Sequence, residues 1–142
     1  MRTLALDVGT KTIGVAVSDE LGITANGVTT IRRKDIEYDM VELSKIIDRY
    51  SPSELLVGVP YRSDGTVSKR GEAILEFSGK LKERFGLPVK YWDESFSTSN
   101  AERFLIDADL SRKKRKKVID KMAAVYILAE YLESRRNLTE ES

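Results

Sequence analysis

Residues 4–19 read Leu4-Ala5-Leu6-Asp7-Val8-Gly9-Thr10-Lys11-Thr12-Ile13-Gly14-Val15-Ala16-Val17-Ser18-Asp19. Two apolar runs with strand-like composition flank a tight Gly-Thr-Lys turn, which is the pattern of a β-hairpin. We therefore predict strands at about 2–8 and 12–18, with a single carboxylate, that of Asp7, on the first strand.

Asp7 stands among apolar residues, where a charge without a partner costs several kcal/mol. A divalent metal ion, or a phosphate group held nearby, would supply the partner. Alternatively, the Asp7 side chain caps the turn amides of residues 8–10. The same Asp-x-Gly-Thr-Lys pattern also occurs in hairpins that cradle nucleotide phosphates, so this motif alone leaves the chemistry open.

The residue types that the chain lacks exclude several kinds of catalytic and metal site. The chain has 142 residues, the size of one domain, and contains neither cysteine nor histidine. A disulfide framework, zinc bound by cysteine and a Ser-His or Cys-His nucleophile are therefore excluded. With no apolar run near the roughly 20 residues that span a bilayer and no signal-peptide layout, we expect no membrane contact and a cytoplasmic location. Catalysis would rest on carboxylates, lysines, hydroxyls and a hard metal ion.

The remaining pattern predicts an α/β architecture in one domain, residues 1–136, with a disordered acidic tail at 137–142. The expected elements are, in order, a strand at 24–32, a helix at 36–50, a strand at 55–59, a helix to Phe85, a strand at 88–92, a short helix to about Asp107 and a helix at 118–136. Three strands joined by short turns and followed by strand–helix units imply a mixed sheet, its first three strands antiparallel, with helices on its faces.

Three acidic residues lie where an apolar residue or a turn would be expected: Asp7 on the first strand, Glu94 after the last strand and Asp120 in the first turn of the last helix. Ligands of open α/β sheets gather at the carboxyl ends of the strands, so the three carboxylates are expected to converge there. Such a group suits Mg²⁺ or Mn²⁺, and two ions can activate water for phosphodiester cleavage. Asp93 is the reserve ligand, because a slip of one residue reverses its face. Alternatively, Asp120 only complements the helix dipole.

Cationic residues near the same edge predict a path for nucleic acid. They are Lys11, Arg62, Lys69, Arg70 and the basic block at 112–117, which includes Arg112, Lys113, Lys114 and Arg115. We expect this block to form a loop before the last helix. A run of like charge often contacts nucleic acid, although the alternative is a solvated surface.

Four motifs resemble one family along nearly the whole chain. They are Asp-Val-Gly-Thr-Lys-Thr-Ile-Gly-Val-Ala-Val-Ser at 7–18, Leu-Val-Gly-Val-Pro with Asp-Gly-Thr at 56–66, Asp-Glu-x-x-Ser-Thr at 93–98, and Asp-Lys-x-Ala-Ala-x-x-Ile-Leu at 120–128. They are similar to the YqgF/RuvX family of Holliday junction resolvase-like nucleases, also described as pre-16S rRNA nucleases. The resemblance implies an RNase H-like fold with a five-stranded mixed sheet, and Asp7, Glu94 and Asp120 as catalytic carboxylates.

The resemblance also implies a metal-dependent nuclease that processes the 5′ end of pre-16S rRNA, with ribosomal particles as partners and a monomer or weak homodimer as its state. The chain departs from the family pattern at Ser95, where an Arg is common, and at Arg62, where an Asn is usual. Three alternatives stay open: resolution of branched DNA, a non-catalytic RNA-binding factor, and an ATP-binding module of the actin/sugar-kinase type. The last normally needs a second such domain and a longer chain.

Overall fold

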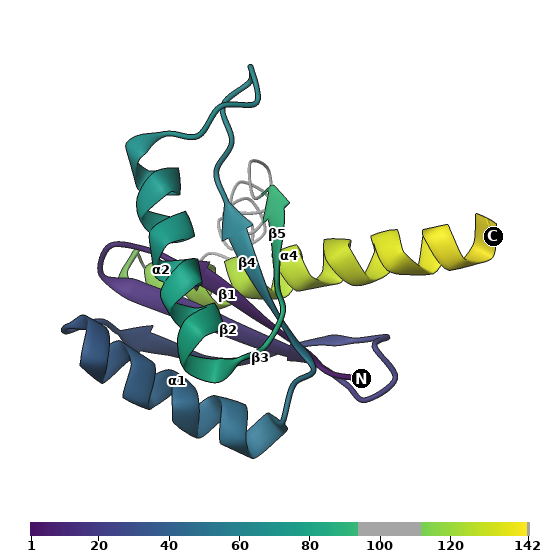
Figure 1. Ribbon diagram of the computed structural model, residues 1–142, viewed down its shortest axis with the longest axis horizontal. Helices are drawn as coiled ribbons and strands as arrows, with labels where there is room; N and C mark the ends of the chain where they lie inside the picture. Colours follow the sequence, from purple (N-terminus) through teal and green to yellow (C-terminus); the bar gives the residue numbers. More distant parts are fainter. Residues whose placement is uncertain (94–111, 142) are drawn as a thin grey trace.

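The computed structural model describes residues 1–93 and 112–141, and within the last helix it describes the side chains of residues 122–136. The elements of the described residues, shown in Figure 1, are β1 (Thr3–Val8), β2 (Thr12–Ser18), β3 (Ala25–Arg32), α1 (Ile36–Tyr50), β4 (Glu54–Val59), α2 (Lys69–Phe85), β5 (Val89–Asp93) and α4 (Arg112–Glu141). This order agrees with the predicted one, element by element, up to residue 93.

The five strands form one mixed sheet in the order β3-β2-β1-β4-β5. β1 pairs antiparallel with β2, and β2 pairs antiparallel with β3, as short turns between consecutive strands require. β4 runs parallel to β1, and β5 runs parallel to β4, each reached through a helix. The predicted five-stranded mixed sheet with three antiparallel strands is confirmed, and the carboxyl ends of β1, β4 and β5 meet at one edge.

The sheet separates two apolar cores. On one face, Leu4, Leu6 and Val8 of β1 pack with the buried side chains of α1 and α2. On the other face, Ala5 and Ala16 pack under α4. Figure 1 shows α1 and α2 on one side of the sheet and α4 crossing the other. Because successive strand residues point to opposite faces, each position on β1 is assigned to one of these two layers.

The ends of α1 and α2 follow ordinary capping chemistry. Asp35 accepts a hydrogen bond from the Tyr38 amide at 2.8 Å, and the Ser68 hydroxyl accepts one from the Gly71 amide at 3.2 Å. Gly86 ends α2 with a φ of 65°, in the left-handed region that glycine enters without a steric penalty. The Ser68 cap thereby fixes the start of α2 just beyond the loop that follows β4.

The last helix begins earlier than the sequence analysis expected. α4 starts at Arg112, so the basic block at 112–117 is helical and the predicted loop is wrong for these residues. Lysine and arginine are good helix formers, and a helix already stabilised by packing extends through them at little cost. α4 continues to Glu141. The predicted short helix to about Asp107 lies outside the described residues, among which no helix is long and apolar enough to cross a membrane.

Candidate active site

Asp7 lies on the face of β1 that α4 covers. The alternation along β1 sends Leu6 and Val8 to the core under α1 and α2, and Ala5 to the core under α4. Asp7 shares the face of Ala5 and is partly buried, one residue from the end of the strand. The sequence prediction of a carboxylate on the first strand, at the edge where strands end, is confirmed.

The two positions beside Asp7 on the neighbouring strands are glycines. Asp7 pairs with Gly14 of β2. On the other side Leu6 pairs with Val57, so one further step along the parallel ladder brings Asp7 beside Gly58 of β4. Neither glycine has a side chain, so the two positions directly beside Asp7 contribute only backbone to this face of the sheet.

The position of Asp120 follows from the direction of α4. Ala124 and Leu128, one and two turns after Asp120, are completely buried against the sheet. Asp120 therefore occupies the sheet-facing side of the helix backbone. A Cβ added at Gly22 would lie 4.0 Å from Leu132 Cδ2, so Leu132 lies over the β2–β3 turn. Asp120 precedes Leu132 by about 18 Å of helix.

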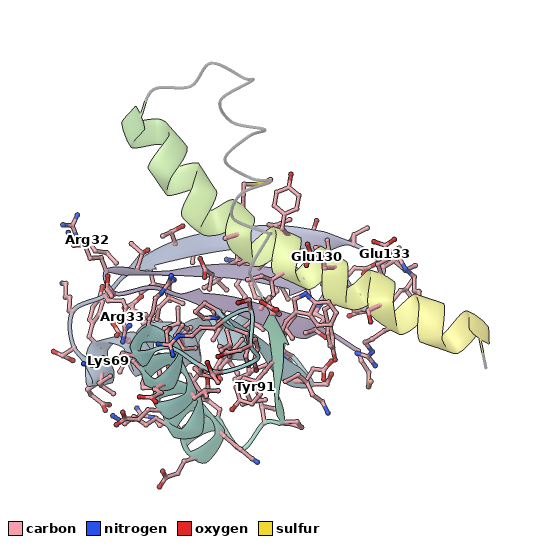
Figure 2. The ribbon with its side chains drawn as sticks, turned by 90° about the horizontal axis from the view of Figure 1, so that it is seen from above. Arg32, Arg33, Lys69, Tyr91, Glu130 and Glu133 are labelled. Carbon is pink, nitrogen blue, oxygen red and sulfur yellow. The ribbon has the colours of Figure 1, made fainter. Side chains whose placement is uncertain are left out.

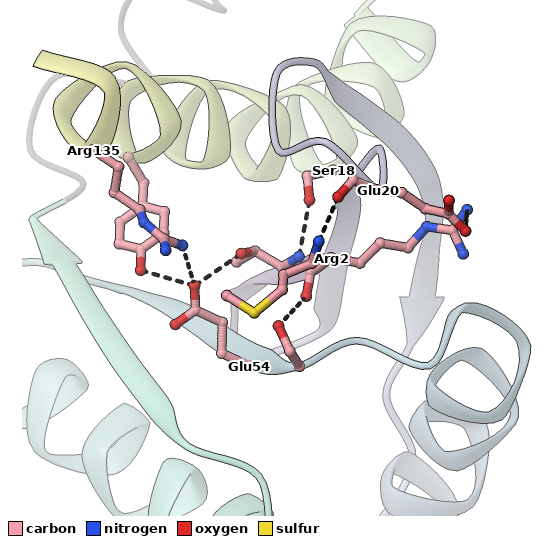
Figure 3. Close-up of polar contacts among 9 residues, drawn as sticks. Arg2, Ser18, Glu20, Glu54 and Arg135 are labelled. Carbon is pink, nitrogen blue, oxygen red and sulfur yellow. Dashed lines mark hydrogen bonds and ion pairs between the residues drawn. The ribbon is translucent and has the colours of Figure 1, made fainter. Parts of the chain in front are cut away.

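Because residues near Leu132 lie over the start of β1, the beginning of α4 extends toward the end of β1, where Asp7 lies. The C-terminal half of α4 is anchored by Glu54, at the start of β4. Its Oε1 accepts hydrogen bonds from the Thr3 hydroxyl at 2.9 Å, the Tyr131 hydroxyl at 2.9 Å and Arg135 Nη1 at 2.8 Å. Figure 3 shows this group between the helix and the strand.

Burial raises the pKa of the Tyr131 phenol, and its hydrogen bond to the Glu54 carboxylate adds to that shift. The contacts of Glu54 with Tyr131 and Arg135 hold the later turns of α4 on the sheet. They thereby fix the direction in which the helix axis runs back toward Asp120.

Asp93 lies on the opposite side of the sheet from Asp7. Along β5, Val89 packs on the core under α1 and α2, whereas Trp92 packs on the core under α4. Asp93 alternates with Trp92 and is exposed, so it shares the face of Val89. Glu94 lies outside the described residues, as does the side chain of Asp120. Within the described part of the chain, no three acidic side chains gather into a group able to hold a metal ion.

Arg33 ties down the turn that follows Asp7, a feature that the sequence analysis missed. Its Nη1 donates to the Gly9 carbonyl at 2.7 Å and its Nε donates to Asp39 Oδ2 at 2.9 Å. The Arg33 amide also donates to the Lys11 carbonyl at 2.8 Å. Asp39 is only 1% exposed. A buried acid among the apolar positions of the helix at 36–50 was the available signal, because such a group needs a cationic partner.

Four predicted cations lie in segments that follow strands at the same edge as Asp7. Lys11 is exposed in the β1–β2 turn, Arg62 is exposed in the loop after β4, and Lys69 and Arg70 are exposed in the first turn of α2. In Figure 2, Arg32, Arg33 and Lys69 lie on the side of the molecule toward which the first turns of α4 extend. The cations at 112–115 belong to those first turns by their backbone, and their side chains are outside the described part.

The loop that carries Arg62 is held by Asp64. Asp64 Oδ1 accepts from the Thr66 hydroxyl at 2.6 Å and from the Thr66 amide at 2.9 Å. These two donors hold the pKa of the Asp64 carboxyl below its usual range. The Gly65 amide donates to the Arg62 carbonyl at 2.9 Å, so the backbone of Arg62 is fixed in a closed turn above the end of β4.

Comparison with known proteins settles the family. A family model described as RuvX, Holliday junction resolvase, matches residues 1–134. The chain belongs to this family. It is 58% identical over 134 residues to a protein of Desulforamulus reducens, covering 94% of this chain and 98% of that protein. It is 56% identical over 138 residues to one of Geobacillus kaustophilus, covering 96% and 100%. Both carry the name "Putative pre-16S rRNA nuclease".

Solved structures agree on the fold. A Thermus thermophilus RuvC in complex with a Holliday junction substrate superimposes with a TM-score of 0.61 at 13% identity, covering 96% of each chain. A fowlpox virus resolvase in complex with Holliday junction DNA gives 0.60 at 14% identity, covering 94% of this chain and 98% of that one. The RNase H-like fold is thereby shown, and the nuclease family makes this chain a hydrolase of phosphodiester bonds.

Proposed function

We propose that this protein is a metal-dependent nuclease that processes the 5′ end of pre-16S rRNA. The observation that carries the proposal is the position of Asp7, partly buried on the α4 face, beside two glycines, at the edge where β1, β4 and β5 end. The high identity to relatives named for pre-16S rRNA supports RNA as the substrate. With that substrate, the protein would act on ribosomal particles in the cytoplasm.

In this proposal Asp7, Glu94 and Asp120 hold Mg²⁺ or Mn²⁺. The donor set fits, because carboxylate oxygens are the ligands that these hard ions prefer. Asp7 has glycines at the two positions directly beside it on the sheet, and the sheet-facing position of Asp120 is directed toward the same edge. When bound, the ions would supply activation of water and neutralisation of charge at the scissile phosphate. Lys11 and Lys121 are candidates for further stabilisation of that charge.

The first test compares Asp7→Asn with Asp93→Asn, two isosteric changes on opposite faces of the sheet. Loss of a group that only supports a metal ligand costs about 10- to 100-fold, so loss of a ligand itself should cost at least about 100-fold in cleavage rate. Asp7→Asn and Glu94→Gln should therefore abolish cleavage and weaken Mn²⁺ binding measured by calorimetry. Asp93→Asn should leave both close to wild type. Equal effects of Asp7→Asn and Asp93→Asn would contradict the proposed ligand set.

The second test concerns metal dependence. Cleavage should stop in excess chelator and return with Mg²⁺ or Mn²⁺, whereas Ca²⁺ should bind without supporting turnover well, because its larger and looser coordination positions oxygens poorly. Full activity in chelator, from protein free of contaminating nuclease, would rule the proposal out.

A second candidate function is the resolution of branched DNA, which the description of the matching family favours. Precursor rRNA and a four-way DNA junction should be offered side by side to the same preparation. Preference for precursor rRNA supports processing, and symmetric cuts in the junction support resolution. If neither is cut with metal present, a non-catalytic RNA-binding role becomes the better account.

A further inference from the structure

A pocket lies at the end of β1 on the face opposite to α4. Its volume is about 240 Å³, slightly below the range of about 300–1,000 Å³ that is usual for drug-sized ligands. Val8, Gly9 and Thr10 form one wall, directly after Asp7 in the chain. The pocket therefore opens beside the edge of the sheet at which the proposed catalytic carboxylates converge. The end of β1 lies between the pocket and these carboxylates.

The walls combine apolar surface with a few polar groups. Ile36, Ala73 and Ile74 supply apolar surface from α1 and α2. Ile36 is a large apolar side chain that remains 40% exposed. The Arg33 guanidinium, which also lies 4.9 Å from the centre of the Phe77 ring, contributes a planar cationic wall.

Glu76 and Lys80 place one hydrogen-bond acceptor and one donor in the lining of the same pocket. A flat, heteroaromatic ligand with polar edges suits such a lining, because its faces meet apolar or guanidinium surface and its edges meet Glu76 and Lys80.

We propose that this pocket binds one unpaired nucleobase of the substrate strand, next to the scissile phosphate. The inference rests on the proposed nuclease function and adds a subsite to it. Asp7 and the pocket wall of Val8, Gly9 and Thr10 are consecutive in the chain, with the Asp7 carboxylate on the α4 face of the sheet and the pocket on the other. A strand that crosses this end of the sheet with a phosphate at Asp7 therefore brings a base to the mouth of the pocket, and the exposed Lys11 lies directly after Thr10 in the same turn.

The occupant is a nucleobase rather than an apolar segment of a protein because the surrounding charges favour a polyanion. Arg33 and Lys80 belong to the lining, and Lys69 and Arg70 are exposed at the start of the same helix, α2. Figure 2 shows Lys69 and Arg33 on the same side of the molecule. Lys69, Arg70 and Lys80 can contact the phosphates on either side of a base that has entered the pocket, whereas the charge of Arg33 is already paired with that of Asp39.

The test is a scan with abasic nucleotides. A short single-stranded RNA is synthesised with one abasic site at each position in turn, and its affinity is measured by fluorescence anisotropy in chelator, where no cleavage occurs. Stacking of one base contributes enough that its removal should lower affinity about tenfold at one position near the cleaved bond. Other positions should change much less. A strand that binds equally well with every abasic site, or no binding at all, would overturn the pocket.

Two variants on α2 connect that effect to the pocket. Ala73→Phe fills the cavity, so it should bind the intact strand about tenfold more weakly and remove the penalty of the sensitive abasic site. Gly79→Phe adds the same ring on the same helix, where an added Cβ would meet nothing within 4 Å, and it should behave as wild type. Equal weakening of intact and abasic strands by Ala73→Phe would contradict the proposal.

If Ala73→Phe does not fold, as judged by thermal unfolding, Ile36→Gln at the exposed rim replaces it with the same expected outcome. Because affinity is measured without cleavage, the two proposals fail separately. Base-selective binding by a protein that cuts nothing would remove the nuclease proposal and keep the pocket. Metal-dependent cleavage with no abasic-sensitive position would remove the pocket proposal and keep the nuclease proposal.

Discussion

Arg33 connects three parts of the fold: the β1–β2 turn, α1 and α2. It holds the Gly9 carbonyl in the turn after Asp7 and neutralises Asp39 in the first turns of α1. Its ring contact with Phe77 adds α2 to the group. The Lys34 amide gives Asp39 a second donor at 3.2 Å. The geometry of the hairpin that carries Asp7 therefore depends on a buried ion pair as well as on strand pairing.

Replacing Arg33 should test this dependence. Arg33→Met leaves the Asp39 carboxylate buried without its cation, and breaking a buried pair in this way typically costs about 3–5 kcal/mol. We expect a loss of about 3 kcal/mol in the free energy of unfolding, measured with denaturant. The double variant Arg33→Met with Asp39→Asn should recover part of this loss, because no charge is then left buried. A loss below about 1 kcal/mol in the single variant would show that water or other groups solvate Asp39.

The sequence revealed Asp7 but not Arg33, and the reason is physical. Asp7 is anomalous within a local pattern, since its neighbours in the strand are apolar. Arg33 and Lys34 form an ordinary polar pair between a strand and a helix, and only the folded chain brings Arg33 to Gly9. Glu54 was missed for the same reason, because its partners Tyr131 and Arg135 lie far along the chain.

The middle and the later turns of α4 make different contacts with the sheet. Its middle contributes Ala124, Ile127 and Leu128 to the core on the sheet. Its later turns hold Glu54, and the Trp92 indole donates to Glu130 at 3.0 Å while its ring meets Tyr131 edge to face. The helix is thus fixed to the sheet from β4 and β5, and its first turns, with Asp120, extend from that anchor.

Tyr131→Phe should loosen the anchor and change the pH dependence of stability. Losing a hydrogen bond to a carboxylate costs roughly 1.5 kcal/mol, and the phenyl ring keeps the packing. The folded state raises the phenol pKa above its ordinary value of 10.0. The corresponding stability is therefore fully present below pH 10 and is lost as pH rises through the folded pKa.

Thermal unfolding between pH 8 and 11 measures this dependence. The wild-type protein should lose stability more steeply than Tyr131→Phe at the alkaline end of the series. Parallel curves for the two proteins would mean that the phenol titrates alike in the folded and unfolded states.

Most elements were predictable because their signals are local. Two apolar runs around a Gly-Thr-Lys turn identified the hairpin, and helical spacing identified α1. The fully apolar run at 55–59 identified a strand buried on both faces. The start of α4 was not predictable in this way. Six consecutive cations have no apolar face, so only the packing of the later turns and the helix propensity of Lys and Arg explain why the helix includes them.

Considered as a whole, the molecule has a net charge of only +1, yet its cations are unevenly placed. Arg32, Arg33 and Lys69 lie toward the end where α4 begins, whereas Glu130 and Glu133 lie farther along that helix (Figure 2). A neutral protein with one cationic edge attracts a polyanion to that edge and not to the rest of its surface. The edge is the one at which Asp7 lies.

The oligomeric state should separate the two candidate substrates. A resolvase needs two sites at a fixed spacing to cut both strands of a junction together. For a processing nuclease we expect a monomer or weak homodimer in sedimentation at micromolar concentration, and unpaired nicks in any four-way junction that is cut. A tight dimer that makes paired incisions would favour resolution of branched DNA instead.

The salt dependence of RNA affinity should show which cations contact phosphate. Each phosphate contact on a single strand contributes about −0.7 to the slope of log K against log salt. Lys69→Gln with Arg70→Gln should therefore weaken binding and make the slope shallower by about 1.4.

Lys45→Gln with Lys82→Gln removes two exposed lysines away from that edge, in the second half of α1 and the last turn of α2. This variant has the same net charge and should leave the slope unchanged. If the two variants behave alike, total charge rather than position governs binding, and the cationic edge has no specific role. Neutralising residues 112–115 extends the test to the first turn of α4, where an unchanged slope would identify the basic block as solvated helix.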